Sequence, residues 1–174
     1  MKKAKTNKIK EKTTTAPADD ILSSLKYRDI IEKQGSAILE NETFQKQKEF
    51  MQHGKRNTYD HVLAVTDKSI GIAKHLPFKY DEAALVRAAL LHDYYLYDWH
   101  HPGKGHHFHF VRHGRWAKEN AIRDFNVGKR EQNSIRWHMF PASLVPPRYL
   151  EGWYITAADK ICAAAEFIKR RRKK

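Results

Sequence analysis

Cysteine is almost absent from the sequence, because Cys162 is the single one among 174 residues. The chain can therefore form no intramolecular disulfide. Its start lacks the charged, apolar and small-residue segments of a signal peptide. No uncharged apolar run approaches the roughly 20 residues that cross a bilayer. We expect a cytoplasmic protein, whose length fits one domain with a sizeable core.

Strand patterns and internal repeats are also missing, whereas helix signals recur along the chain. The first expected helix has Asp19 or Asp20 as its N-cap and stops at Gly35, and the second runs from Ser36 to His53. Further helices are expected at 57–76, which ends before Pro77, at 81–92, which Asp81 caps, and at about 113–125, about 129–139 and about 150 onward. We predict an all-α bundle that forms a single domain over residues 19–168.

Positive charge is concentrated at the two ends of the chain. Of the formal net charge of +13, residues 1–18 carry +5 and residues 169–174, with the sequence KRRRKK, carry +6. The remaining +2 belongs to residues 19–168, so the basic composition says little about a central site. We expect both ends to be solvated, disordered tails. Weak, nonspecific contact of these tails with nucleic acid or an anionic membrane is the alternative.

Two polar residues interrupt apolar helical faces. His92 continues the apolar stripe formed by Ala84, Leu85, Ala88 and Leu91, so it points toward the core. Asp159 lies in the nearly all-apolar stretch WYITAADKICAAAEFI and shares a face with Ile155, Ala158 and Cys162. A buried carboxylate normally neutralises, pairs or binds a metal, so Asp159 needs a cation.

Three further histidines lie in similar settings. His61 is one turn before Val65, His138 is close to one turn after Ile135, and His113 opens the stretch HGRWAKENA. Each one alone is more often a satisfied core or surface residue than a ligand, and arginine or lysine is also available to pair with Asp159. Together, inward-facing histidines and carboxylates on successive helices favour a metal centre, because converging helices supply nitrogen and oxygen ligands from distant positions.

The order of these residues resembles the motif of the HD-domain superfamily, an all-helical group of metal-dependent phosphohydrolases. The resemblance covers about residues 50–168 and includes the segments TYDHVLAV, LLHDYYLYDWH, HFVRHGRWAKENA, IRWHMFP and ADKICAAAE. It implies a first metal ion bound by His61, His92, Asp93 and Asp159. It also implies a second ion at His113 and His138, with Asp93 as the bridge. His92 and Asp93 are the expected catalytic residues, and Asp93 would orient the attacking water.

One position departs from the pattern of the superfamily. Gly114 follows His113, where many relatives have proline. We expect this change to affect the loop more than the ligand. The nearby His109 is an alternative to His113.

The ligand types define the expected chemistry. Histidine and carboxylate without a usable thiolate favour iron, manganese, cobalt, nickel or zinc. Two such divalent ions can activate water and neutralise phosphate charge. We therefore expect a metal-bound hydroxide to hydrolyse a phosphoester or phosphoanhydride of a nucleotide or other small phosphorylated metabolite. The residues expected to bind this substrate are Lys55, Arg56, His109, Arg112, Arg115 and Lys160.

Two other functions stay open at this point. Some HD-fold proteins use a di-iron centre for oxidation, and the same ligand set is compatible with an oxygenase. A noncatalytic module that binds RNA or a membrane through its basic tails is the other alternative. The glycine-tyrosine-proline signature of the HD enzymes that cleave cyclic dinucleotides is missing, which disfavours that substrate.

The segment that follows the His-Asp pair also has two interpretations. Its tract HHPGKGHHFH (residues 100–109) is expected to be a flexible loop, which either binds metal adventitiously or forms a lid or rim beside the metal centre. The aromatic stretch DYYLYDWHH either packs between helices or stacks against a nucleotide base.

Overall fold

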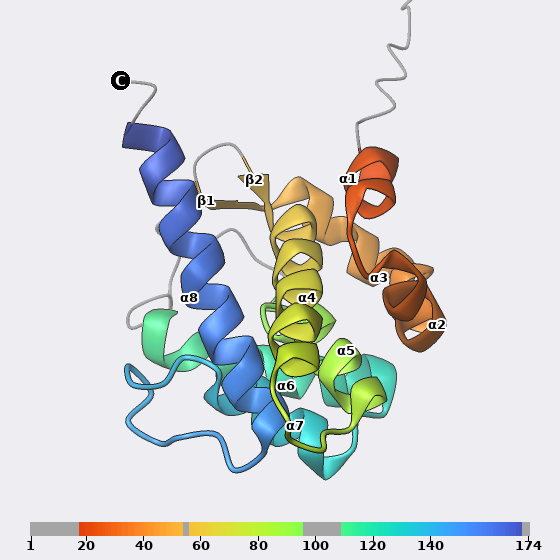
Figure 1. Cartoon of the computed structure of the whole chain (residues 1–174). Helices are drawn as coiled ribbons and strands as arrows, with labels where there is room; N and C mark the ends of the chain where they lie inside the picture. The colour runs from red at the N-terminus through yellow and green to blue at the C-terminus, as the bar shows by residue number, and fades with distance from the viewer. Residues whose placement is uncertain (1–17, 54–55, 96–108, 172–174) are drawn as a thin grey trace, which may run out of the picture.

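The computed structural model describes residues 18–53, 56–95 and 109–171 of the chain. It confirms the all-α prediction, with one small two-stranded sheet in addition (Figure 1). In chain order the elements are α1 (Ala18–Ser24), α2 (Arg28–Leu39), α3 (Glu42–Gln45), the 3-10 helix η1 (Lys46–Glu49), β1 (Met51–His53), β2 (Arg56–Asn57), α4 (Thr58–His75), α5 (Glu82–Leu91), α6 (His109–Phe125), α7 (Lys129–Trp137) and α8 (Leu150–Arg171).

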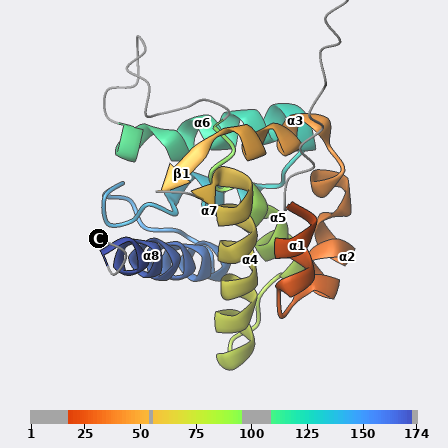
Figure 2. The same ribbon diagram turned by 90° about the horizontal axis from the view of Figure 1, so that it is seen from above.

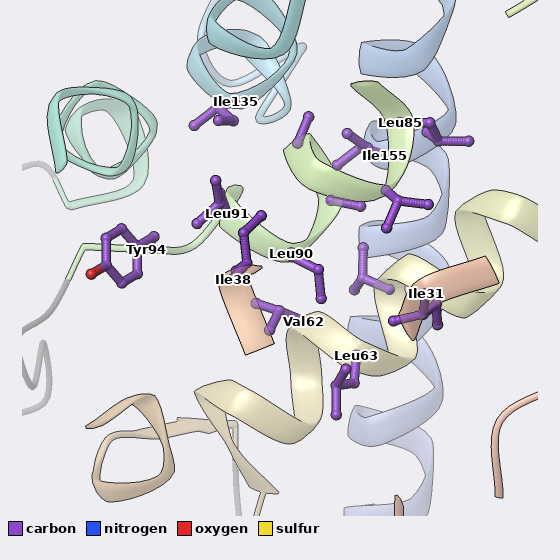
Figure 3. Packing of buried hydrophobic residues seen from close by; sticks show 14 of the residues in the cluster. Ile31, Ile38, Val62, Leu63, Leu85, Leu90, Leu91, Tyr94, Ile135 and Ile155 are labelled. Atoms are coloured by element: carbon purple, nitrogen blue, oxygen red, sulfur yellow. The ribbon is translucent and has the colours of Figure 1, made fainter. Parts of the chain in front are cut away.

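Helix α5 lies at the centre of the hydrophobic core. Its sequence EAALVRAALL is apolar on nearly all sides, as expected for a buried helix. Figure 3 shows its leucines packed among side chains of α2, α4, α7 and α8, including Ile38, Val62, Ile135 and Ile155. In both Figure 1 and Figure 2, α4 lies between α8 and α1. Polar side chains that these helices direct inward therefore meet inside the bundle.

The first expected helix is in fact two helices, α1 and α2. The chain turns between them at Tyr27, whose backbone N–H donates to the Asp67 carboxylate of α4 at 2.8 Å. A long-range hydrogen bond of this kind cannot be read from local propensity. In addition, α1 begins at Ala18, ahead of both expected N-cap residues.

Gly35 lies inside α2 and does not end a helix, so that prediction is wrong. A Cβ atom at this position would lie 2.5 Å from Cδ1 of Leu90 in α5. Two atoms cannot approach so closely, so glycine leaves room for Leu90 at the contact between α2 and α5, and any larger residue would require the Leu90 side chain to shift. Gly35 is a packing residue.

The prediction of a single helix from Ser36 to His53 is also wrong. The Asn41 side chain accepts hydrogen bonds from the backbone N–H groups of Thr43 and Phe44, at 2.9 and 3.0 Å, and so begins the separate helix α3. After η1 the chain extends into β1, which pairs antiparallel with β2. These short strands, which the sequence analysis did not anticipate, lead directly into α4.

The later helices follow their expected positions closely. Helix α4 ends before Pro77, and Asp81 caps α5 by accepting a hydrogen bond from the Ala84 N–H at 2.9 Å. Helix α6 begins earlier than expected, and α8 continues past residue 168 to Arg171. The domain limits and the tails stay predictions, since residues 1–17 and 172–174 lie outside the described ranges. Within those ranges, no helix has both the length and the apolar character required to span a membrane.

Candidate metal centre

The six predicted ligands come together in the interior of the bundle. They are His61 of α4, His92 at the C-cap of α5, the adjacent Asp93, His113 of α6, His138 at the C-cap of α7 and Asp159 of α8. All are buried except Asp159, whose side chain is 15 % exposed. Each lies within 4 Å of at least one other member of the set. Five helices therefore hold or immediately precede one cluster of nitrogen and oxygen donors.

Asp93 lies between two groups of histidines. Its Oδ2 atom is 3.6 Å from Nε2 of His92 and 3.9 Å from Nε2 of His61. Its Oδ1 atom is 3.4 Å from Nε2 of His113 and 3.7 Å from Nε2 of His138. Burial acts to raise the pKa of the Asp93 carboxyl, but the four surrounding histidines outweigh it and lower that pKa. Asp93 is therefore an anion with one oxygen directed to each group.

His92 and His138 are anchored in the same way. Nδ1 of each ring donates to the carbonyl oxygen three residues earlier, at 2.7 Å for Ala89 and 2.9 Å for Ile135. This hydrogen bond leaves Nε2 of each ring directed into the cluster, where it can offer a lone pair to an ion. Burial, together with His92 and His113, lowers the pKa of His138 to about 3, so this ring is neutral at ordinary pH.

A bound cation fits this arrangement. Nε2 of His92 is buried and has no hydrogen-bond partner among the residues that the structure describes. A buried polar atom left without a partner costs about 1–3 kcal/mol, which coordination to a metal would offset. The donors form two groups that share His92, one with His61 and Asp159 and one with Asp93 and His138. In each group the ligand atoms lie within 4.8 Å of one another. Histidine and carboxylate ligands suit the divalent transition metals.

His61 is enclosed by two carboxylates of α8. Its Nε2 is 3.1 Å from Oδ1 of Asp159, and its Nδ1 is 3.6 Å from Oε1 of Glu166. Burial opposes a charge on the ring, but the two carboxylates outweigh it and raise the pKa of His61 to about 10. Burial likewise opposes the charge on Asp159, and its hydrogen bond to His61 lowers the pKa of this carboxyl. Without an ion, His61 thus supplies the cation that Asp159 needs.

Glu166 is a residue of the site that the sequence analysis missed. It follows Asp159 by seven residues on α8 and so lies on the same face of that helix. Besides the contact with His61, it accepts a hydrogen bond from Nη1 of Arg56 at 2.9 Å. The spacing of seven residues from a predicted ligand is the signal that could have identified it.

His113 lies one turn inside α6, because the helix opens at His109. Gly114 is consequently a helical residue. The prediction that glycine at this position affects a loop is therefore wrong. A Cβ at Gly114 would lie 2.8 Å from the carbonyl oxygen of Arg136, so the backbones of α6 and α7 touch at this point. The close approach places Nε2 of His113 3.0 Å from Nε2 of His138. The side chain of His109 lies outside the described set, so its role as an alternative ligand stays a prediction.

The residues predicted to bind substrate have different surroundings. Arg56 pairs with Glu166, and Arg115 pairs with Glu119 at 2.8 Å. Arg112 is exposed on α6. Lys160 is exposed on α8 beside Asp159, and partial burial lowers its pKa. Lys55 lies outside the described ranges, and the substrate contacts of all these residues stay predictions.

The two tyrosines after the His-Asp pair are buried. Tyr94 packs against Phe44 and Phe125 and donates a hydrogen bond to Asp124 at 2.9 Å, which confirms the packing interpretation for this residue. The ring of Tyr95 lies 6.0 Å from that of His113 and borders the cluster. The rest of the aromatic stretch and the His-rich residues 100–108 lie outside the described part of the chain.

A comparison with known protein families identifies the family of the chain. The family model described as HD domain matches residues 58–164. The matched range begins with α4 and contains all six clustered residues. Neither the curated proteins nor the solved structures contain a match to the chain.

Proposed function

The chain belongs to the HD-domain family, whose members are in general metal-dependent hydrolases, and on this basis we propose that it hydrolyses a phosphoester or phosphoanhydride bond. The proposed substrate is a nucleotide or another small phosphorylated metabolite. The observation that carries the proposal is the position of Asp93, with one oxygen toward His92 and His61 and the other toward His113 and His138. A carboxylate placed in this way suits the bridge of a two-ion centre.

Each member of the cluster has a defined part in this reaction. His61, His92 and Asp159 would hold one ion, and His113 and His138 the other, with Asp93 shared by both. Divalent ions in such a centre lower the pKa of bound water and neutralise charge on a phosphate. Asp93 stays ionised because the histidines outweigh its burial and lower its pKa, so its carboxylate oxygens can serve as ligands and can accept a hydrogen bond that orients the attacking water. Exposed cations near the cluster, Lys160 and Arg112, would compensate the charge of the phosphate.

Phosphate release tests the proposal directly. The protein is incubated with nucleotides, dinucleoside polyphosphates, cyclic dinucleotides and sugar phosphates in the presence of manganese, iron or cobalt. Asp93→Ala is the inactive control, and Asp29→Ala, which changes an exposed aspartate of α2, is the matched control that should keep wild-type activity. Hydrolysis by the wild type and Asp29→Ala, but not by Asp93→Ala, supports the proposal. Activity in Asp93→Ala equal to the wild type would overturn it.

A second experiment follows if no compound releases phosphate. If the wild type binds two iron ions and releases no phosphate from any compound, oxygen consumption is measured with the same compounds. Substrate-dependent oxygen uptake would replace the hydrolase proposal with the oxygenase alternative.

A further inference from the structure

Glu166 contacts His61 on the side of the ring that faces away from Asp159. The same oxygen, Oε1, lies 3.6 Å from Nδ1 of His61 and 2.9 Å from Nη1 of Arg56. The side chain of Glu166 is 13 % exposed and that of Arg56 is 32 % exposed, so both are partly buried and Glu166 is the more shielded of the two. One carboxylate of α8 thus joins a predicted ligand on α4 to an arginine on β2.

The two nitrogens of His61 have different surroundings. Nε2 faces the cluster, 3.1 Å from Asp159 and 3.9 Å from Asp93. If Nε2 binds an ion, the ring's proton is on Nδ1, because a neutral imidazole carries one proton. A carboxylate opposite Nδ1 favours this tautomer and fixes the rotation of the ring.

The other histidines of the cluster show why His61 needs such a partner. His92 and His138 obtain the same tautomer from backbone carbonyls within their own helices, at 2.7 and 2.9 Å. At His61 the group opposite Nδ1 is the carboxylate of Glu166, 3.6 Å away, which comes from a different helix. The orientation of His61 therefore depends on how α8 and β2 hold Glu166.

We propose that Glu166 is a positioning residue of the metal centre, which holds His61 with Nε2 toward the ions, and that Arg56 fixes Glu166 in turn. This inference rests on the proposed function, since it requires that the cluster bind metal. It gives Arg56 a role in the support of a ligand, in place of the substrate contact expected from the sequence. It also makes the β1–β2 hairpin part of the support of the site.

The proposal predicts a graded loss of metal affinity. Removal of an outer partner of a histidine ligand typically weakens metal binding about 10- to 100-fold. We expect a loss of about that size for Glu166→Ala. Glu166→Gln keeps the size of the side chain and one acceptor oxygen, so its loss should be smaller. Arg56→Gln should also weaken metal binding, because Glu166 remains but no longer has the arginine that fixes its position.

The matched control is a second arginine–glutamate pair away from the cluster. Glu131, 8 % exposed, pairs with Arg87 between α7 and α5. Glu131→Gln removes one partner of a comparable pair without a contact to any of the six clustered residues in the described structure. It should keep wild-type metal affinity even if the protein becomes less stable.

The experiment is a titration of the metal-free proteins with cobalt(II), followed by the visible absorption of the bound ion. The dissociation constant reports affinity, and the positions of the bands report the ligand geometry. Weaker binding and shifted bands in Glu166→Ala, with a smaller change in Glu166→Gln and none in Glu131→Gln, support the proposal. If Glu166→Ala fails to fold, Glu166→Gln is judged by the same two measurements.

Three results would overturn the proposal, and they differ in meaning. Wild-type affinity and bands in both Glu166 variants would overturn this proposal and leave the proposed function intact. An equal loss in Glu131→Gln would show a general effect of stability and also overturn it. Failure of the wild type to bind cobalt would overturn the proposed metal centre together with the role of Glu166.

Discussion

Oδ1 of Asp93 lies 3.4 Å from Nε2 of His113, while the other oxygen of the same carboxylate faces a different pair of histidines. This relationship separates the proposed ion sites. In His113→Ala the proposed second site loses one of its residues, whereas the group of His61, His92 and Asp159 stays complete.

We therefore expect His113→Ala to bind one ion where the wild type binds two, and to hydrolyse substrate more slowly. Asp93→Ala should bind neither ion firmly and give no hydrolysis above background. Metal content after dialysis, measured by inductively coupled plasma mass spectrometry, distinguishes the variants. Two ions retained in His113→Ala would contradict the assignment of this histidine.

Gly114 determines how closely α6 approaches α7. In Gly114→Ala the new Cβ would meet the carbonyl oxygen of Arg136 at 2.8 Å, and a backbone atom cannot move aside as a flexible side chain can. We expect a loss of about 1–3 kcal/mol in the free energy of unfolding, as for other overpacked sites. Because His113 moves away from His138, the variant should also bind less metal.

Thermal unfolding with and without metal checks this prediction. Gly71→Ala in α4 is the control, since its Cβ would meet only the ring edge of Tyr27, at 3.3 Å, and that side chain can shift. A Gly114→Ala protein as stable as the wild type would show that the α6–α7 contact is unimportant.

Much of the helical framework could be predicted because its signals are local. Asp81 caps α5 and Pro77 follows the end of α4, as expected from their neighbours in sequence. The six clustered residues could be predicted because their order along the chain resembles a family motif. Both a helix cap and a family motif can be identified from the sequence without knowledge of tertiary contacts.

The errors arise where a contact between distant segments decides the outcome. Gly35 looks like a helix stop, but its role is to admit Leu90 of α5. Asn41 lies inside a stretch with helical signals, yet its side chain caps a new helix and ends the pattern. The partnership of Arg56 with Glu166 spans 110 positions in the sequence, so spacing alone could not reveal it.

Cys162 should be unreactive in the folded protein. Burial, with a smaller effect of Asp159, raises the pKa of this thiol to about 11. The thiolate is the reactive form, so alkylation by iodoacetamide at pH 8 should be roughly 100-fold slower than in the unfolded chain. Mass spectrometry of the labelled protein measures both rates. Cys162→Ala should retain hydrolytic activity, and equal labelling rates in the folded and unfolded states would contradict this prediction.

The basic ends should be separable from catalysis. The six clustered residues lie within residues 58–164, far along the chain from most of the lysines at its start. A protein without residues 1–17 and 172–174 should bind metal and hydrolyse substrate like the full chain. Its salt-dependent association with RNA or anionic vesicles, if the full chain shows any, should decrease. Loss of hydrolysis with unchanged folding would assign the tails a part in catalysis.

His61 should couple metal binding to pH. In the absence of an ion, burial opposes protonation of the ring, but Asp159 and Glu166 raise its pKa to about 10, so the ring is charged near neutral pH. An ion needs the lone pair of Nε2, so it must displace this proton. His138, with a pKa lowered by burial and by His92 and His113 to about 3, carries no proton on Nε2 that an ion would displace. We therefore expect metal affinity to rise about tenfold per pH unit from roughly pH 7 and to level off near pH 10.

In the metal-free protein, by contrast, the stability contributed by His61 falls as the pH rises. Since the pKa of His61 is raised above the ordinary value of 6.5, its contribution to stability is complete below pH 6.5 and is lost as the pH rises through about 10. Isothermal titration calorimetry with manganese, in two buffers of different ionisation enthalpy at pH 7.5, measures the protons released. About one proton per first ion bound is expected. No proton release, together with an affinity that is constant from pH 7 to 9, would show that His61 is already neutral and that its pair of carboxylates does not hold the charge.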